Sequence, residues 1–211
     1  MIANVLLGVL EKGLQLDPGT FTSLHRLQDC SGDFLRVLRY PGSDTPETVD
    51  PLRFPAHKDA VSVAILFTFL GGLQIVEPGA VPENTSPFEI PDSAWRWIKP
   101  VPGTAIINLG DAMEVFTNGV LKSGLHRVVK APGPQRPHDK YSVLIVARPE
   151  DSTPMKSFKS PLIPEDTEEQ KNAHVETSIE WGNNKIKKLQ DFIDKLQSLR
   201  AGKKDVLDRS W

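Results

Sequence analysis

Two histidines and one aspartate carry the most informative chemistry in this sequence. His57 and Asp59 stand two positions apart, directly before an apolar run that predicts a strand. Residues i and i+2 of an extended backbone project from the same side, so the imidazole and the carboxylate can reach one point. His126 lies in another predicted strand, residues 125–129. Two histidines and one carboxylate form the facial ligand set of non-haem Fe(II), but strand histidines are also commonly packed or solvated, so the spacing alone leaves both interpretations open.

Short apolar runs between turn signals supply the elements that must position these side chains. From about residue 33 to residue 148, Pro-Gly, Gly-Gly and Asn-Gly pairs separate the runs. This texture favours an all-β barrel or sandwich over alternating strands and helices. The predicted strands are residues 34–40, 61–69, 73–76, 95–98, 104–109, 125–129 and 141–147.

Helices are expected on both sides of the strand-rich region. The first residues place apolar side chains at helical spacing: Ile2, Val5, Leu6, Val9 and Leu10. A second helix is predicted with Asp17 as N-cap and Pro18 as its first residue, and with Phe21, Leu24 and Leu27 on its inner face. Residues 150–166 predict an extended strap. A long C-terminal helix is predicted from five apolar positions: Trp181, Ile186, Leu189, Ile193 and Leu196.

Composition and charge exclude several classes of protein. The 211 residues include 25 basic and 27 acidic side chains, a net charge of −2, with 39% hydrophobic residues. This is ordinary globular composition, without the basic excess of a nucleic-acid-binding protein. The single cysteine, Cys30, excludes an intramolecular disulfide framework and fits a reducing compartment. No run is long and apolar enough for a membrane span. We therefore expect a cytoplasmic protein without nucleic-acid or membrane partners, and a monomer by default.

An ordered series of sequence blocks surrounds the three candidate ligands. In chain order the blocks are residues 35–41, His57-Lys58-Asp59, Gly71-Gly72-Leu73-Gln74-Ile75, residues 97–103, Asn108-Leu109-Gly110-Asp111, residues 117–123, His126-Arg127-Val128-Val129 and Lys140-Tyr141-Ser142. This series resembles the Fe(II)/2-oxoglutarate-dependent dioxygenases of the isopenicillin N synthase-like family, from about residue 1 to residue 165. The Pro-rich segment after His126 and the C-terminal helix resemble the fungal members.

The resemblance implies a mainly β fold with flanking helices, built on a double-stranded β-helix (jelly-roll) core. It implies that His57, Asp59 and His126 hold the iron. It also implies that 2-oxoglutarate binds the iron at one end, while its far carboxylate meets Tyr40, Ser142 and the residue at position 140.

The sequence departs from the family pattern at two positions of the co-substrate site. Lys140 stands where the family has arginine, which replaces a two-pronged guanidinium by a compact charge on a flexible stem. We expect weaker or less selective co-substrate binding as a result, with Arg136 as a less favoured substitute. Leu38 stands where some members have an asparagine near the other end of the co-substrate.

The activity implied by the resemblance is oxidative decarboxylation of 2-oxoglutarate with O2. This reaction is coupled to hydroxylation, desaturation or ring closure of a small organic molecule, as in fungal secondary metabolism. The alternatives are a catalytically impaired or regulatory relative that binds metal and a small carboxylate, and a cupin-like zinc or manganese enzyme. We expect residues 1–32 to be a helical lead-in, 33–149 the oxygenase core, and 150–211 the strap and C-terminal helix. Members of the family usually carry about 100 further residues ahead of the core, so the resemblance leads us to expect a shortened protein.

Other chemically able side chains are assigned structural roles. Trp97 is expected in the core or against a terminal helix, and Asn108 and Asp111 are expected to bond to backbone groups in a turn. Arg127 points away from the metal site and is expected to form an ion pair. Three further histidines are expected to be solvated or on a polar stretch: His25, His138 and His174.

Overall fold

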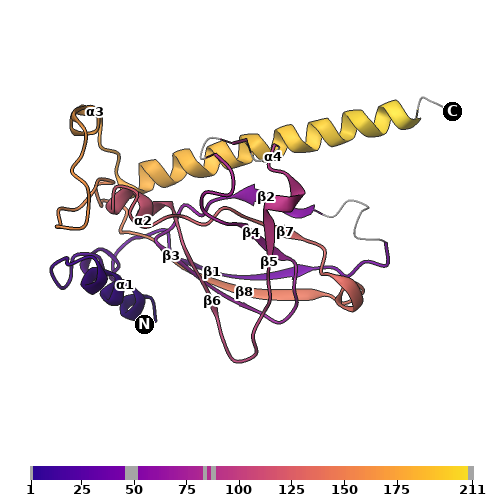
Figure 1. Cartoon of the computed structure of the whole chain (residues 1–211), viewed down its shortest axis with the longest axis horizontal. Coiled ribbons are helices and arrows are strands. Elements are labelled where there is room, and N and C mark those ends of the chain that lie inside the picture. The colour runs from indigo at the N-terminus through magenta and orange to yellow at the C-terminus, as the bar shows by residue number, and fades with distance from the viewer. Residues whose placement is uncertain (1, 46–51, 83–84, 87–88, 209–211) are drawn as a thin grey trace.

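Two antiparallel sheets of four strands form the centre of the molecule, with helices outside them (Figure 1). The computed structural model describes residues 2–45, 52–82, 85–86 and 89–208, without the side chains at 196 and 199–208. One sheet has the order β1-β8-β3-β6 and the other β2-β7-β4-β5. The strands are β1 (Phe34–Tyr40), β2 (Leu52–His57), β3 (Val63–Thr68), β4 (Leu73–Val76), β5 (Trp95–Ile98), β6 (Ile106–Leu109), β7 (His126–Val129) and β8 (Lys140–Ala147). This arrangement confirms the mainly β, jelly-roll prediction.

Helices and short turns connect and flank the sheets. The α-helices are α1 (Ile2–Gly13), α2 (Asp111–Phe116), α3 (Glu168–Asn172) and α4 (Ser178–Asp208), and three 3₁₀ turns are Thr22–Leu24, Asp92–Ala94 and Gly133–Gln135. The long C-terminal helix α4 was expected from its apolar spacing, whereas α2, α3 and strand β2 were missed. None of these helices, within the ranges given above, is both long enough and apolar enough to cross a membrane.

Strand alternation separates the hydrophobic core from the inside of the barrel. In β3, Val63 and Ile65 pack in the main core, where α1 and α2 cover the sheet. The alternate residues of the strand, Ala64 and Leu66, line the internal cavity instead. A strand has a period of two, so each central strand serves a packed core on one face and the cavity on the other.

The main core is built around three aromatic rings. Phe116 of α2 lies 6.1 Å from Phe21 and 5.3 Å from Phe158 between ring centroids. Phe21 and Phe116 have no exposed surface, and burial of one such side chain contributes about 1.5–3 kcal/mol to folding. These contacts join the N-terminal region, the turn after β6 and the strap into one unit.

The N-terminal region corrects two predictions. Residues 17–22 form turns rather than a second α-helix. The buried Glu11 carboxylate accepts hydrogen bonds from the backbone N–H groups of Gly19, Phe21 and Thr22, which holds this segment in a loop around α1. Leu27, expected on the inner face of that helix, is 76% exposed.

The buried face of α1 also differs from the expected one. The predicted apolar set was correct for Leu6 and Leu10, which pack against the core, but Ile2, Val5 and Val9 are exposed. Ala3 and Leu7 are buried in their place. The helix carries apolar residues on two faces, and spacing alone does not decide which of them meets the sheet.

Candidate metal and co-substrate site

His57 and His126 face each other across two paired strands. His57 ends β2, His126 begins β7, and the two residues are direct partners in the sheet. Their ring centroids lie 4.2 Å apart. The register shifts twice along β2, between Leu52 and Phe54 and again between Phe54 and His57. Such bulges re-aim side chains, and here they accompany the placement of both rings on one point.

Asp59 is brought to the same point by the loop after β2. Its Oδ1 lies 3.4 Å from His57 Nε2, and its Oδ2 lies 3.8 Å from His126 Nε2. Its backbone carbonyl accepts a hydrogen bond from the Asp111 N–H at 2.8 Å, at the start of α2. A Cβ added at Gly110 would overlap the carbonyl oxygens of Val61 and Asp59, so only glycine lets this turn approach so closely.

Backbone carbonyls orient both imidazoles. His57 Nδ1 lies 2.9 Å from the Pro55 carbonyl oxygen, and His126 Nδ1 lies 3.0 Å from that of Gly124. A carbonyl only accepts, so these contacts assign the ring proton to Nδ1 and leave Nε2 with a lone pair directed at the other ligands. This is the tautomer that a metal requires.

The electrostatics of Asp59 and His126 favour the metal-binding forms of these two residues. Burial, followed by the nearby His57, lowers the pKa of His126, which keeps this imidazole neutral. Burial by itself would raise the pKa of Asp59, but its contacts with His57, His126 and the Asn108 amide together lower it. The Asp59 carboxylate therefore stays ionised beside the neutral His126 imidazole.

The donor set fits Fe(II). One ligand atom from each of His57, Asp59 and His126 lies within 4.8 Å of the others, and these three residues are the only such group found in the described part of the chain. Two imidazole nitrogens and one carboxylate oxygen suit a non-haem iron with open coordination positions. The structure thus brings together the three residues proposed as ligands from the sequence.

Asn108 belongs to this site, contrary to the expected backbone role. Its Nδ2 donates a hydrogen bond of 2.8 Å to Asp59 Oδ2. Asn108 is the only polar residue of β6. Because strand residues alternate between the two faces of a sheet, the position of Asn108 in the strand could have predicted that its side chain lies inside the barrel. The prediction for Asp111 was also wrong: its carboxylate accepts a hydrogen bond of 2.7 Å from Lys185 Nζ of α4.

A second polar group lies where β1 and β8 meet. Lys140 is only 5% exposed, and its Nζ donates to Thr68 Oγ1 and to the Leu70 carbonyl oxygen, both at 2.9 Å. Ser142 Oγ donates to Thr68 Oγ1 at 3.2 Å. Tyr40 pairs directly with Lys140 in the sheet. Burial lowers the pKa of Lys140 to about 8 and raises that of Tyr40.

One cavity contains both polar groups. It has a volume of about 1160 Å³, and it is lined by His57, Asp59 and His126 and also by Tyr40, Lys140 and Ser142; we call it the barrel cavity. Its remaining walls are largely apolar and come from both sheets. Three residues on one face of α4 complete the wall: Ile186, Leu189 and Ile193. Figure 1 shows α4 running along one side of the two sheets.

Several other side chains lie outside the site. Arg127 forms the expected ion pair, with Nη2 3.1 Å from Asp92 Oδ1, and its guanidinium lies over the Trp95 ring at 4.2 Å. Trp97 is 47% exposed rather than in the core, because β5 is the edge strand of its sheet.

The expectation for the remaining histidines was wrong at one position. His25 is 2% exposed rather than solvated, with its ring nitrogens hydrogen-bonded to the Phe21 carbonyl and to Ser62 Oγ. His138 and His174 are exposed, as expected.

Sequence comparison identifies the family. The 2OG-Fe(II) oxygenase superfamily matches residues 31–149. The chain belongs to this superfamily. The chain is 50% identical over 198 residues to a 2-oxoglutarate-dependent dioxygenase of Aspergillus fumigatus, covering 91% of the chain and 51% of the relative. It is also 31% identical to the 2-oxoglutarate-dependent dioxygenase iboH of Amanita muscaria, covering 72% of the chain and 68% of that relative.

Solved structures share the fold of the chain. A full-length Neurospora crassa protein, crystallised in complex with α-ketoglutarate and thymine, aligns with a TM-score of 0.66 at 22% identity, over 90% of the chain and 54% of its own. A 2OG-Fe(II) oxygenase family protein from Caulobacter crescentus aligns with a TM-score of 0.68 at 24% identity, over 89% of the chain and 55% of its own. The chain spans about half the length of most of the relatives it matches. The narrower isopenicillin N synthase-like assignment stays a prediction.

Proposed function

We propose that the chain is a non-haem Fe(II) dioxygenase that couples oxidative decarboxylation of 2-oxoglutarate to oxidation of a small organic molecule. One observation carries this proposal: the His57, Asp59 and His126 cluster shares a cavity with Lys140, Ser142 and Tyr40. A metal site and a cationic site in one largely apolar cavity suit a ligand with a chelating end and a carboxylate end.

His57, Asp59 and His126 would hold the iron. Iron bound there would supply the activation of dioxygen that couples conversion of 2-oxoglutarate to succinate and CO2 with oxidation of the substrate. The protein's part is orientation. The Pro55 and Gly124 carbonyls fix the two imidazoles, and Asn108 fixes the carboxylate. Such outer hydrogen bonds raise ligand basicity and hold ligand geometry.

Lys140, Ser142 and Tyr40 would bind the far carboxylate of 2-oxoglutarate. Two of the three ammonium protons of Lys140 are used by Thr68 and Leu70, so one remains for the ligand. The Ser142 and Tyr40 hydroxyls are additional donors to an anion. A buried ammonium beside a carboxylate forms a charge-assisted hydrogen bond, which is stronger than a neutral one.

The substrate would occupy the rest of the barrel cavity beneath α4. The α4 wall presents Ile186, Leu189 and Ile193, and the cavity also contains the buried Ser123 hydroxyl, which has no partner in the described structure. An apolar wall with one spare hydrogen-bonding group suits a small, largely apolar molecule with a polar substituent. The fungal relatives support a role in fungal secondary metabolism, with hydroxylation as the default outcome.

We also propose the domain limits and setting expected from the sequence. Residues 33–149 form the oxygenase core, 1–32 lead into it, and 150–211 form the strap and C-terminal helix. The net charge of −2 and the single cysteine support a cytoplasmic monomer that does not bind nucleic acid or membranes.

Anaerobic titration with Fe(II) and 2-oxoglutarate tests the proposal. The wild-type protein is expected to develop a metal-to-ligand charge-transfer band and, with O2, to form succinate. His57→Ala and His126→Ala are expected to lose both signals, whereas His174→Ala, which changes an exposed histidine, retains them. Succinate formation that survives in both ligand variants would overturn the assignment. A different metal that restores activity better than Fe(II) would favour the zinc or manganese alternative.

A further inference from the structure

A small cavity adjoins the carboxylate end of the barrel cavity. It is lined by Tyr40, Pro41, Arg53, Val129, Lys130, Ala131, Arg136, His138 and Lys140, and we call it the basic cavity. Tyr40 and Lys140 line both cavities, so the two cavities meet at these residues. The lining contains two lysines and two arginines and, among the described residues, no acidic side chain. An anion that reaches Tyr40 and Lys140 therefore lies beside further positive charge.

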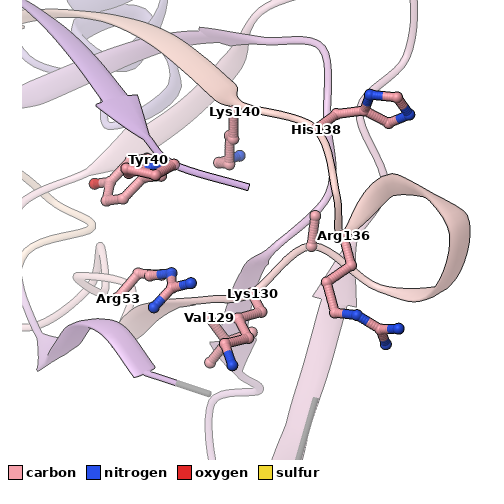
Figure 2. A pocket seen from close by; sticks show the side chains of 9 residues that line it. Tyr40, Arg53, Val129, Lys130, Arg136, His138 and Lys140 are labelled. Carbon is pink, nitrogen blue, oxygen red and sulfur yellow. The ribbon is translucent and has the colours of Figure 1, made fainter. Parts of the chain in front are cut away.

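Arg53 is the arginine that points into this space. It lies in β2, four positions before His57, and it is half-buried. Figure 2 shows its guanidinium directed toward the space below Tyr40, whereas the guanidinium of Arg136 points away from it. The structure gives the Arg53 side chain no hydrogen bond or ion pair with the described residues, so within that part of the chain the five N–H donors of its guanidinium are available.

Lys140 alone is a limited receptor for a carboxylate. It has one donor left after Thr68 and Leu70, whereas a carboxylate offers two oxygens. A guanidinium can bind both oxygens with two parallel hydrogen bonds, which an ammonium cannot do. Arg53 has this chemistry and lies at the cavity that Lys140 and Tyr40 also line.

We propose that Arg53 binds the far carboxylate of the co-substrate together with Lys140 and Tyr40. This inference rests on the proposed function. The guanidinium that is absent from position 140 of β8 is then supplied from β2, in the opposite sheet. Arg136, the substitute considered from the sequence, is not the residue that contributes. Two cations on opposite sheets also select a dicarboxylic 2-oxo acid over a monocarboxylic one, because only the former has a second anion to place between them.

Calorimetric binding to the Fe(II)-loaded protein under nitrogen tests the role of Arg53. The ligands are 2-oxoglutarate and 2-oxopentanoate, which has the same chain length but no far carboxylate. Arg53→Gln is expected to weaken 2-oxoglutarate binding about 10- to 100-fold, the range for loss of a hydrogen-bonded charge, and to leave 2-oxopentanoate binding unchanged. Arg53→Lys keeps the charge and is expected to lose only part of that affinity. Arg96→Gln, on the exposed edge strand β5, is the matched control.

The outcomes separate this proposal from the proposed function. If the wild-type protein binds 2-oxoglutarate and Arg53→Gln binds it equally well, the role of Arg53 is refuted while the proposed function stands. Equal loss for both ligands also refutes it, because the effect then lies at the metal end. A loss confined to Arg136→Gln assigns the role to Arg136 instead. If the wild-type protein does not bind 2-oxoglutarate at all, the proposed function fails first.

Discussion

The low pKa of Lys140 predicts that co-substrate binding depends on pH between about pH 7 and pH 9. Burial lowers this pKa to about 8, so the ammonium is about nine-tenths charged at pH 7 and about one-tenth charged at pH 9. A bound carboxylate raises the pKa of Lys140 again, so Lys140 keeps its proton in the complex. The affinity for 2-oxoglutarate is therefore nearly full at pH 7 and below, and it falls as the pH rises through 8.

The magnitude follows from this titration. If 2-oxoglutarate binds only to protein in which Lys140 is charged, its dissociation constant is expected to be about tenfold higher at pH 9 than at pH 7. Binding near pH 8 is expected to take up about half a proton, which calorimetry in buffers of different ionisation enthalpy measures. Burial raises the pKa of Tyr40, so its hydroxyl stays protonated throughout this range.

Two controls isolate Lys140 as the titrating group. In Lys140→Arg the side chain stays charged, so the dissociation constant is expected to vary by less than about twofold from pH 7 to pH 9. Binding of 2-oxopentanoate to the wild-type protein is also expected to be independent of pH, because it has no far carboxylate. An equal pH slope for both ligands, or a slope that survives in Lys140→Arg, would refute the reasoning.

Three further changes test the supports of the site. Asn108→Ala removes the donor to Asp59 Oδ2 and is expected to weaken metal binding about 10- to 100-fold, measured by anaerobic Co(II) titration. Gly110→Ala forces a methyl group against backbone carbonyls and is expected to lower stability by about 1–3 kcal/mol, measured by urea unfolding. Lys185→Met removes the ion pair with Asp111 and is expected to speed amide hydrogen exchange in α4, with about 1 kcal/mol or less lost globally because Lys185 is partly exposed.

Each of these predictions has a contrary result. Unchanged Co(II) affinity in Asn108→Ala would mean that Asp59 needs no partner. Gly13→Ala meets no atom within 4 Å, and its unfolding free energy is the reference for the glycine substitution; equal effects at Gly13 and Gly110 would rule out the proposed overlap. Exchange in α4 that does not respond to Lys185→Met would show that apolar contacts alone hold the helix.

The strands were predictable because their signals are local. Alternating apolar residues and Gly or Pro turns located seven of the eight strands within three residues at each end. Strand β2 was missed because it contains Pro55 and two register shifts, which break the alternation. The second helix was predicted from Asp17 and Pro18, but the decisive partner of that segment is Glu11, a long-range contact that local patterns do not contain.

The same distinction between local signals and distant contacts applies to the residues of the site. The three candidate ligands were proposed from residue types and spacing, and the Tyr40, Lys140 and Ser142 group from the family resemblance; all six residues line one cavity. The role of Asn108 depends on a hydrogen bond to a residue 49 positions away. Arg53 carries no motif, and its position beside Lys140 follows only from the meeting of two sheets.

The residues proposed to bind the metal and co-substrate and the residues proposed to contact the substrate lie on different elements, because the substrate wall is on helix α4. The metal-facing and carboxylate-facing residues lie on strands or in tight turns, where one substitution disturbs several neighbours. The substrate wall of Ile186, Leu189 and Ile193 lies on one helical face, held by Lys185 and by the buried Trp181. Substitutions on that face reshape the space above the metal site and leave the strands unaltered. In evolution, this helix is therefore the part of the fold through which one oxidative chemistry can be redirected to new molecules.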